Sequence, residues 1–437
     1  MAEAPLIRPL DARFAPPPGV DRLGPAVAGL IGVLRGVSSD PGVRQALLRA
    51  VLGNTRTFRD AAAVLRLVRP RLTIGQSLVR CYEAEGTLML TRAADVAEVL
   101  AREADFEVVY GPRMRALTGG RDFFLGMQDG PQYQRDRSAV DALVQPGDLE
   151  RVLAMARSQA SFALAGAAGA LDIVPALTAR IPALMARDWF GIAAPAEQLI
   201  ADSTILFFYL FSDLTAEPRV EAGALAAAER TRASIRAGAA SAGPETLLGR
   251  AVAAGGQGHP VFDEEGIVAA ILGLFIGAIP TLSKTACLAV EELLRWPEQL
   301  AACRDAARAG DEEAVAPFLW EALRFNPMTP FLYRRTPRPT RIGDESVPAN
   351  RMVLAVLLSA MHDGAAVEEP DSFRPGRPFE VYRLWGEGLH RCWGDRVNRA
   401  ILPAMLTPLL AQENLRQEAP PDGGGTPFFR SYRLAWG

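Results

Sequence analysis

Lysine is almost absent from this sequence of 437 residues, and the charges nearly balance. The 47 basic residues include one lysine, Lys284, and 50 acidic residues leave a net charge of -3. Proteins that bind nucleic acid through its phosphates carry a basic excess, so no nucleic-acid partner is expected. The preference for arginine and alanine is typical of GC-rich bacterial DNA.

Cysteine is also scarce, because the chain has only Cys81, Cys287, Cys303 and Cys392, far apart and without a C-x-x-C pair. This spacing argues against a disulfide framework and against a zinc ribbon. No basic stretch followed by an apolar one stands near the N-terminus, so no secretory signal is expected. We therefore expect a protein of the reducing cytoplasm.

Long hydrophobic runs are missing as well. The longest uncharged run, residues 266–283, falls just short of the ~20 apolar residues of a membrane span and contains Pro280. We interpret it as a buried helix. The 49% hydrophobic and 22% charged content suits a large, soluble globular core, with no membrane partner.

Hydrophobic periodicity predicts a mainly α protein with a minor β portion. A short strand and a helix are expected within residues 72–99, and a hairpin over 340–358 around the Val-Pro-Ala-Asn turn. The main expected helices span residues 149–165, 181–190, 222–237, 264–296, 312–325 and 392–410.

One loop, with the sequence WGEGLHRCWG over residues 385–394, carries the clearest chemistry. Closely spaced glycines let the backbone approach a flat cofactor, and a helix N-terminus stabilises a thiolate such as that of Cys392. A buried cysteine taken alone is more often an inert apolar residue.

The loop resembles the haem loop of the cytochrome P450 family, FGxGxHxCxG, and departs from it only at Trp385. The resemblance implies the P450 fold and haem b, with Cys392 as the axial iron ligand. It covers residues 73–437 as a single haem domain and leaves 1–72 as an N-terminal extension packed on or beside the core. The loop residues expected to contact haem are Trp385, Gly386, Gly388, His390, Cys392 and Gly394.

Two further segments match motifs of the family. Glu321 and Arg324 form its ExxR motif, with Glu321 lying 71 residues before Cys392, and residues 370–377 resemble its PxxFxPxR segment. The resemblance implies that Arg377 joins Glu321 and Arg324 in a buried triad, which holds the haem loop in shape.

The expected ligands of the haem propionates come from three places. Residues 129–137 resemble the start of the family's C helix, where Arg137 and Tyr133 would face the haem, with Tyr133 replacing the usual histidine. In the family, a propionate ligand follows the arginine of the ExxR motif at a fixed spacing, which leads here from Arg324 to Arg334, with Arg335 as the alternative. His390 would be the third donor.

The family's distal helix normally carries an acid and an alcohol that relay protons. Aligning the motif with residues 276–281 places Gly277 and Ala278 over the iron, Ile279 at the acid position, Pro280 at the alcohol position and Thr281 beside it. Neither isoleucine nor proline carries a proton, so ordinary oxygen activation is expected to be impaired. Proline also frees the carbonyl of Ile276, which could hold an ordered water.

The resemblance implies a haem-thiolate monooxygenase that oxidises a small lipophilic molecule with O2 and external electrons. The alternatives are a peroxygenase, a hydroperoxide isomerase, or a haem-binding protein that has lost catalysis. The apolar stretch 205–211 and Phe331 suit a lipophilic pocket, whereas Lys284 either pairs with an anionic substrate or lies at the pocket end or surface.

No flavin or iron–sulfur motif follows the haem loop, so electrons would come from a separate ferredoxin or flavodoxin. Arg391, Arg396 and Arg399 are a candidate docking patch for that partner, although propionate binding or simple solvation would also account for them. A monomer is expected.

Overall fold

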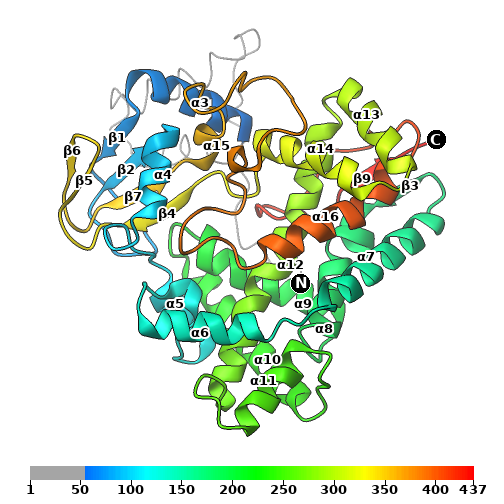
Figure 1. Ribbon diagram of the computed structural model, residues 1–437, viewed down its shortest axis with the longest axis horizontal. Coiled ribbons are helices and arrows are strands. Elements are labelled where there is room, and N and C mark those ends of the chain that lie inside the picture. Colours follow the sequence, from blue (N-terminus) through cyan, green and yellow to red (C-terminus); the bar gives the residue numbers. More distant parts are fainter. Residues whose placement is uncertain (1–54) are drawn as a thin grey trace.

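Helices dominate the computed structural model, which describes residues 55–437, and they surround the central helix α12, Glu264–Leu293 (Figure 1). This agrees with the predicted mainly α fold. The other long helices are α3 (Thr55–Val68), α4 (Ala93–Ala101), α5 (Gly111–Thr118), α6 (Pro131–Ala142), α7 (Asp148–Ala165), α8 (Arg180–Asp188), α9 (Ala196–Phe207), α10 (Pro218–Ala239), α11 (Leu247–Gly256), α13 (Pro297–Arg308), α14 (Glu312–Phe325) and α16 (Asp395–Leu410).

Helix α12 is a core helix. The Asp263 carboxylate caps its N-terminus by accepting a hydrogen bond from the Gly266 amide, and Glu264 and Glu265 add favourable charge to the first turn. By length and composition it is the one helix of the described chain that could cross a membrane, yet 83% of its most apolar window is buried in the protein. It packs against α8, α9, α10 and α14, as predicted for a buried helix.

The largest sheet has four strands in the order β1-β2-β7-β4. Strand β2 (Thr87–Leu90) pairs antiparallel with β1 (Arg71–Ile74) and parallel with β7 (Met352–Ala355), and β4 (Leu332–Arg335) pairs antiparallel with β7. A second sheet joins β3 (Ala170–Asp172), β9 (Arg433–Ala435) and β8 (Arg416–Gln417).

The hairpin predicted over 340–358 is only partly correct. Strands β5 (Thr340–Ile342) and β6 (Glu345–Val347) do pair, but they turn at Gly343, whose φ is 55°. The following strand, β7, leaves this hairpin for the four-stranded sheet. Strand β7 is an inner strand of this sheet, with β2 on one edge and β4 on the other. All four of its side chains are buried, so both faces of the sheet are covered there.

The expected extension over residues 1–72 lies mostly outside the described residues. Its described end forms α3, which packs against the short helix α15 (Leu357–Ala360) and buries Phe58 and Leu65, and then enters β1. The boundary at residue 72 stays a prediction.

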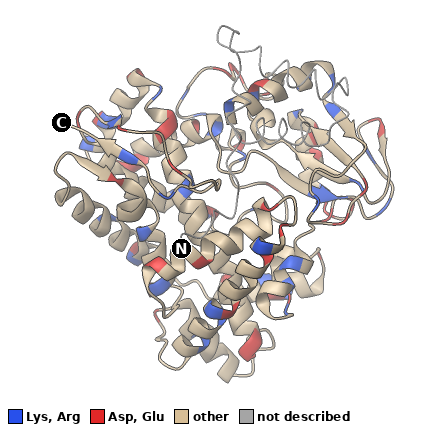
Figure 2. Cartoon of the chain, turned by 180° about the vertical axis from the view of Figure 1, so that it is seen from behind, with Lys and Arg blue, Asp and Glu red and all other residues tan. Residues whose placement is uncertain are grey.

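In the cartoon of Figure 2, basic and acidic residues are interspersed along the helices, strands and loops. This agrees with the near-neutral net charge.

Candidate functional site

A cavity of about 2270 Å³ separates the loop 385–394 from one face of α12. Cys392, His390 and Trp385 line it from the loop, and Gly277, Ala278 and Thr281 line it from the helix. The aromatic walls come from several elements: Tyr82, Tyr110, Phe123, Phe124, Phe207, Phe208, Phe211, Phe331, Phe428 and Phe429.

Glycine backbone geometry shapes the loop. Gly386 and Gly388 have φ values of 69° and 73°, in the left-handed region, and a Cβ at Gly388 would lie 2.1 Å from the carbonyl oxygen of Leu100. The Cys392 amide donates to the Trp385 carbonyl at 2.9 Å, which closes the loop. Trp385 is buried, with its ring stacked on Phe379 at 5.7 Å.

The exposed surface of Cys392 faces the cavity. Burial raises the pKa of its thiol, whereas the Gly394 backbone N–H and the charges of Arg137 and Arg391 lower it. The predicted helix start at Cys392 is wrong, since α16 begins at Asp395, whose amide donates to the Cys392 carbonyl at 3.3 Å. The amide of Gly394 therefore supports the sulfur directly.

The predicted buried triad is confirmed. Arg324 donates to both Glu321 oxygens at 2.8 and 3.0 Å, and Arg377 donates to the same carboxylate at 3.1 Å. Arg324 and Glu321 are fully buried. Arg324 also binds the carbonyls of Met361, Pro370 and Ser372, so the triad ties α14 to the segment that leads into the loop.

The structure separates the two candidate arginines on β4. Arg335 donates twice to Glu107 Oε1, at 2.6 and 2.8 Å. Arg334, on the opposite face of the strand, is buried. Among the described residues it donates only to the Tyr333 carbonyl, at 3.1 Å, and its buried Nε has no partner. Arg334 is therefore the arginine free to bind an anion.

His390 lies close to Arg334 and to Glu103, a residue that the sequence did not single out. Burial, followed by the charges of Arg334 and Arg137, lowers the pKa of His390 to about 3, so its imidazole is neutral. Burial raises the pKa of Glu103, 3.6 Å from the His390 Nε2, and both Glu103 oxygens lack side-chain hydrogen-bond partners. No local sequence signal marks a glutamate just past the end of α4.

Tyr133 and Arg137, the two residues expected from the family's C helix, differ in whether their hydrogen-bonding groups are already occupied. The hydroxyl of Tyr133 donates to the Leu389 carbonyl at 2.8 Å, so Tyr133 already holds the haem loop. Arg137 lines the cavity, pairs with Asp141 at 3.3 Å and lies 4.9 Å from the centre of the Phe124 ring. Sequence analysis also missed Trp393, whose indole N–H donates to the same Asp141 at 2.6 Å.

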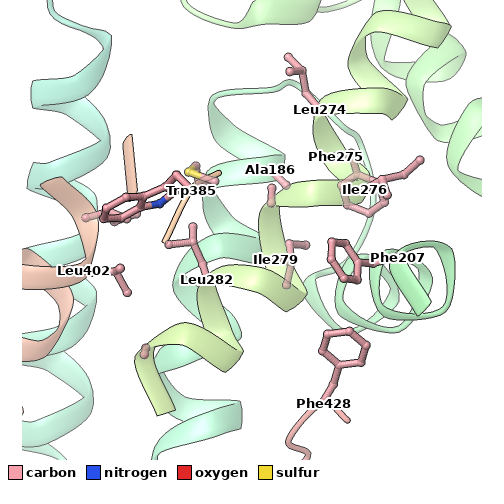
Figure 3. Close-up of a cluster of buried hydrophobic side chains, with 14 of the residues drawn as sticks. Ala186, Phe207, Leu274, Phe275, Ile276, Ile279, Leu282, Trp385, Leu402 and Phe428 are labelled. Carbon is pink, nitrogen blue, oxygen red and sulfur yellow. The ribbon is translucent and has the colours of Figure 1, made fainter. Parts of the chain in front are cut away.

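The expected distal residues do not all face the cavity. Gly277, Ala278 and Thr281 line it, but Ile279 and Pro280 do not. Ile279 lies in a buried hydrophobic cluster near Phe207 and Leu282 (Figure 3). Positions 277, 278 and 281 share one helix face. The alignment with proline at the alcohol position stays a prediction, and an alignment shifted by one residue, with Thr281 as the alcohol, agrees better with the residues that line the cavity.

The Thr281 hydroxyl bonds back to carbonyls of its own helix. It makes a short hydrogen bond to the Gly277 carbonyl and lies 3.4 Å from the Ala278 carbonyl. The helix continues unbroken through Pro280.

The site fits haem. It presents a single sulfur to a large cavity whose facing wall, at Gly277 and Ala278, carries the smallest side chains, and a Cβ at Gly277 would meet nothing within 4 Å. Beside the loop stand a buried, unpaired arginine and a buried imidazole nitrogen without a partner, which suit a carboxylate such as a propionate.

The arginines near Cys392 are partly neutralised. Arg391 and Arg399 each contact Asp395 at 2.6 Å, while Arg396 is exposed. The excess positive charge of this face is therefore smaller than the three arginines alone suggest.

Comparisons with known proteins point to one family. The profile of the cytochrome P450 family matches residues 245–412. The chain is 25% identical over 321 residues to the erythromycin C-12 hydroxylase of Saccharopolyspora erythraea, covering 72% of this chain and 79% of the hydroxylase.

Solved structures give the same fold. The open form of cytochrome P450 EryK from S. erythraea matches with a TM-score of 0.70 at 21% identity, over 86% of this chain and 95% of that chain. P450BioI, crystallised with an acyl carrier protein ligated to hexadec-9Z-enoic acid, matches with a TM-score of 0.75 at 17% identity, over 89% and 99%.

Proposed function

Since the chain belongs to the cytochrome P450 family, a family of haem-thiolate oxidoreductases that bind haem b, we propose that it is a monooxygenase for a small lipophilic molecule. The observation that carries this proposal is Cys392 facing Gly277, Ala278 and Thr281 across one aromatic-walled cavity. The similar hydroxylase of S. erythraea supports the reaction type.

Cys392 is the residue whose sulfur would hold the haem iron. When bound, haem would supply the activation of dioxygen, which the electron donation of a thiolate ligand favours. The Gly394 amide stabilises the thiolate, while Tyr133 and the buried Trp385 hold the loop around it.

We assign propionate binding to Arg334 and His390, with Arg137 as a further donor. Arg334 brings a buried charge without a carboxylate partner, and its planar guanidinium matches a carboxylate in geometry. Neutral His390 offers one ring N–H. Arg137 would have to share its charge between the cofactor and Asp141.

The hydroxyl of Thr281 can hold a proton at the cavity wall opposite Cys392. It donates to the Gly277 carbonyl in this structure, so its oxygen can accept a hydrogen bond from the cavity side. No acid stands next to it on the helix, because Pro280 precedes it. We propose that water in the cavity brings protons to Thr281, which passes them on.

The aromatic and aliphatic side chains of the cavity walls suit a lipophilic substrate. We propose that a separate ferredoxin or flavodoxin delivers the electrons near Arg396, to a monomeric protein in the cytoplasm.

The test is product formation by the purified haem-loaded protein on a panel of lipophilic compounds. One arm contains ferredoxin, its reductase and a nicotinamide cofactor, and the other contains hydrogen peroxide. Oxygenated product in the ferredoxin arm, lost in Cys392→Ser, supports the monooxygenase. Product only with peroxide would assign a peroxygenase instead, and peroxide reduction without substrate oxidation would indicate a protein without oxygenase activity.

A further inference from the structure

The only lysine of the chain faces the substrate cavity. Lys284 lies on α12 three residues after Thr281, and both residues line the cavity on the same side of the helix. Its side chain is half-buried, and its Nζ stands 5.6 Å from the centre of the Phe428 ring. Phe428 in turn packs edge-on against Phe207 at 5.6 Å.

Lys284 has no anionic partner among residues 55–437. Of the arginines that line the same cavity, Arg137 pairs with Asp141, Arg295 with Glu291 and Arg391 with Asp395. Arg80 and Arg219 form no ion pair within the described residues, but both are exposed to solvent, whereas Lys284 is half-buried. Burial lowers the pKa of Lys284 to about 8, and no carboxylate opposes this shift. At pH 7 the ammonium is still charged, at a cost that a bound anion would offset.

The aromatic neighbours do not replace such an anion. A cation over a phenylalanine ring gains only part of what a charge-assisted hydrogen bond to a carboxylate supplies. The structure thus retains a half-buried positive charge beside Phe428, without an anionic partner among the described residues, where a methionine or leucine would pack at lower cost.

We infer that Lys284 binds the anionic head group, such as a carboxylate, of an otherwise lipophilic substrate. This inference rests on the proposed function, because it names the substrate class of the same cavity. Six residues of helix separate Ala278 from Lys284, about 9 Å along the axis, so the head group lies one to two turns away from the haem site. Oxidation is expected on the apolar part of the substrate, away from the charge.

Binding to the haem-loaded protein tests the inference by isothermal titration calorimetry at pH 7. The probes share one chain and differ in charge: decanoate, decanol and decyltrimethylammonium. We expect decanoate to bind about tenfold more tightly than decanol, with the cation weakest. Lys284→Met should remove the preference for decanoate, and Lys284→Arg should retain it.

Arg295→Gln is the matched control, since that cation lines the same cavity but is already paired with Glu291. It should leave the preference for decanoate intact. Lys284→Met should also unfold at the same or a higher temperature than the parent when no ligand is present, because it removes an unpaired, desolvated charge. A clear loss of stability in that variant would instead assign Lys284 a structural role and contradict the inference.

Two failures can be told apart. If the protein binds haem through a thiolate and decanol binds as well as decanoate, both in the parent and in Lys284→Met, only the Lys284 inference falls. If the purified chain takes up no haem, or binds it without the absorbance of thiolate coordination, the proposed function falls and the inference falls with it.

Discussion

Arg334 and Arg335 are neighbours on β4 with opposite environments. Arg335 binds Glu107 at 2.6 Å, whereas Arg334 is 2% exposed and meets no carboxylate in the described chain. Alternation along a strand produces this difference, since successive side chains point to opposite faces.

Arg334→Leu should therefore weaken haem retention. Charge-assisted hydrogen bonds contribute enough that transfer of haem to apomyoglobin should become about tenfold faster. Arg335→Gln is the control and should leave the transfer rate unchanged, because it breaks only the contacts with the Glu107 carboxylate and the Glu83 carbonyl. Faster loss in Arg335→Gln than in Arg334→Leu would reverse the assignment.

Thr281→Val should lower the rate of product formation by about 10²-fold and divert electrons to free peroxide, because a positioned proton donor is lost. Thr281→Ser should retain most of the rate. Product and peroxide are both measured under ferredoxin-driven turnover.

Pro280→Ala distinguishes the two alignments of the distal helix. Pro280 does not line the cavity, so this variant should leave the product yield unchanged and raise the melting temperature, since proline is costly within a helix. A large loss of product with Pro280→Ala, and none with Thr281→Val, would restore the alignment that places proline over the iron.

Asp148 is expected to control acid stability. Burial raises its pKa, but hydrogen bonds from Arg250, the Gln145 amide, Trp189 and Arg151 outweigh burial and hold the pKa well below its ordinary value. A carboxyl with a depressed folded-state pKa stabilises the fold above its unfolded pKa of about 3.9, and this stabilisation is lost as the pH falls further.

Asp148→Asn should lower the free energy of unfolding by about 3–5 kcal/mol at pH 7, because it leaves Arg250 buried without a carboxylate. In urea titrations, the difference in the free energy of unfolding between the parent and Asp148→Asn should become smaller as the pH falls below 5. Asp188→Asn, which breaks the exposed pair with Arg187, should cost less than about 1 kcal/mol. An equal loss at pH 3 and pH 7 would show that the charge of Asp148 is not the cause.

Arg396→Glu should slow reduction by ferredoxin about tenfold at low salt, since Arg396 is exposed while Arg391 and Arg399 share Asp395. Stopped-flow reduction measures this rate, and high salt should narrow the difference. Peroxide-driven turnover of the same variant is the control. Equal losses in both assays would exclude a docking role.

Sequence motifs alone identified the fold class, the haem loop and the buried triad, because each depends on a local pattern. Gly386 and Gly388 have positive φ values, which glycine adopts readily, and their spacing in the sequence already predicts such a loop. Glu321, Arg324 and Arg377 form one charge cluster whose members belong to two motifs of a known family.

Only the tertiary structure distinguishes the environments of Arg334 and Arg335, places Thr281 rather than Pro280 at the cavity wall, and brings Glu103 beside His390. These differences depend on which face of α12 meets the cavity, on which face of β4 carries each arginine, and on contacts between segments far apart in the chain. The same holds for Lys284. The sequence gives its residue type, but only the tertiary structure shows that it lines the cavity near Phe428 with no anionic partner among residues 55–437.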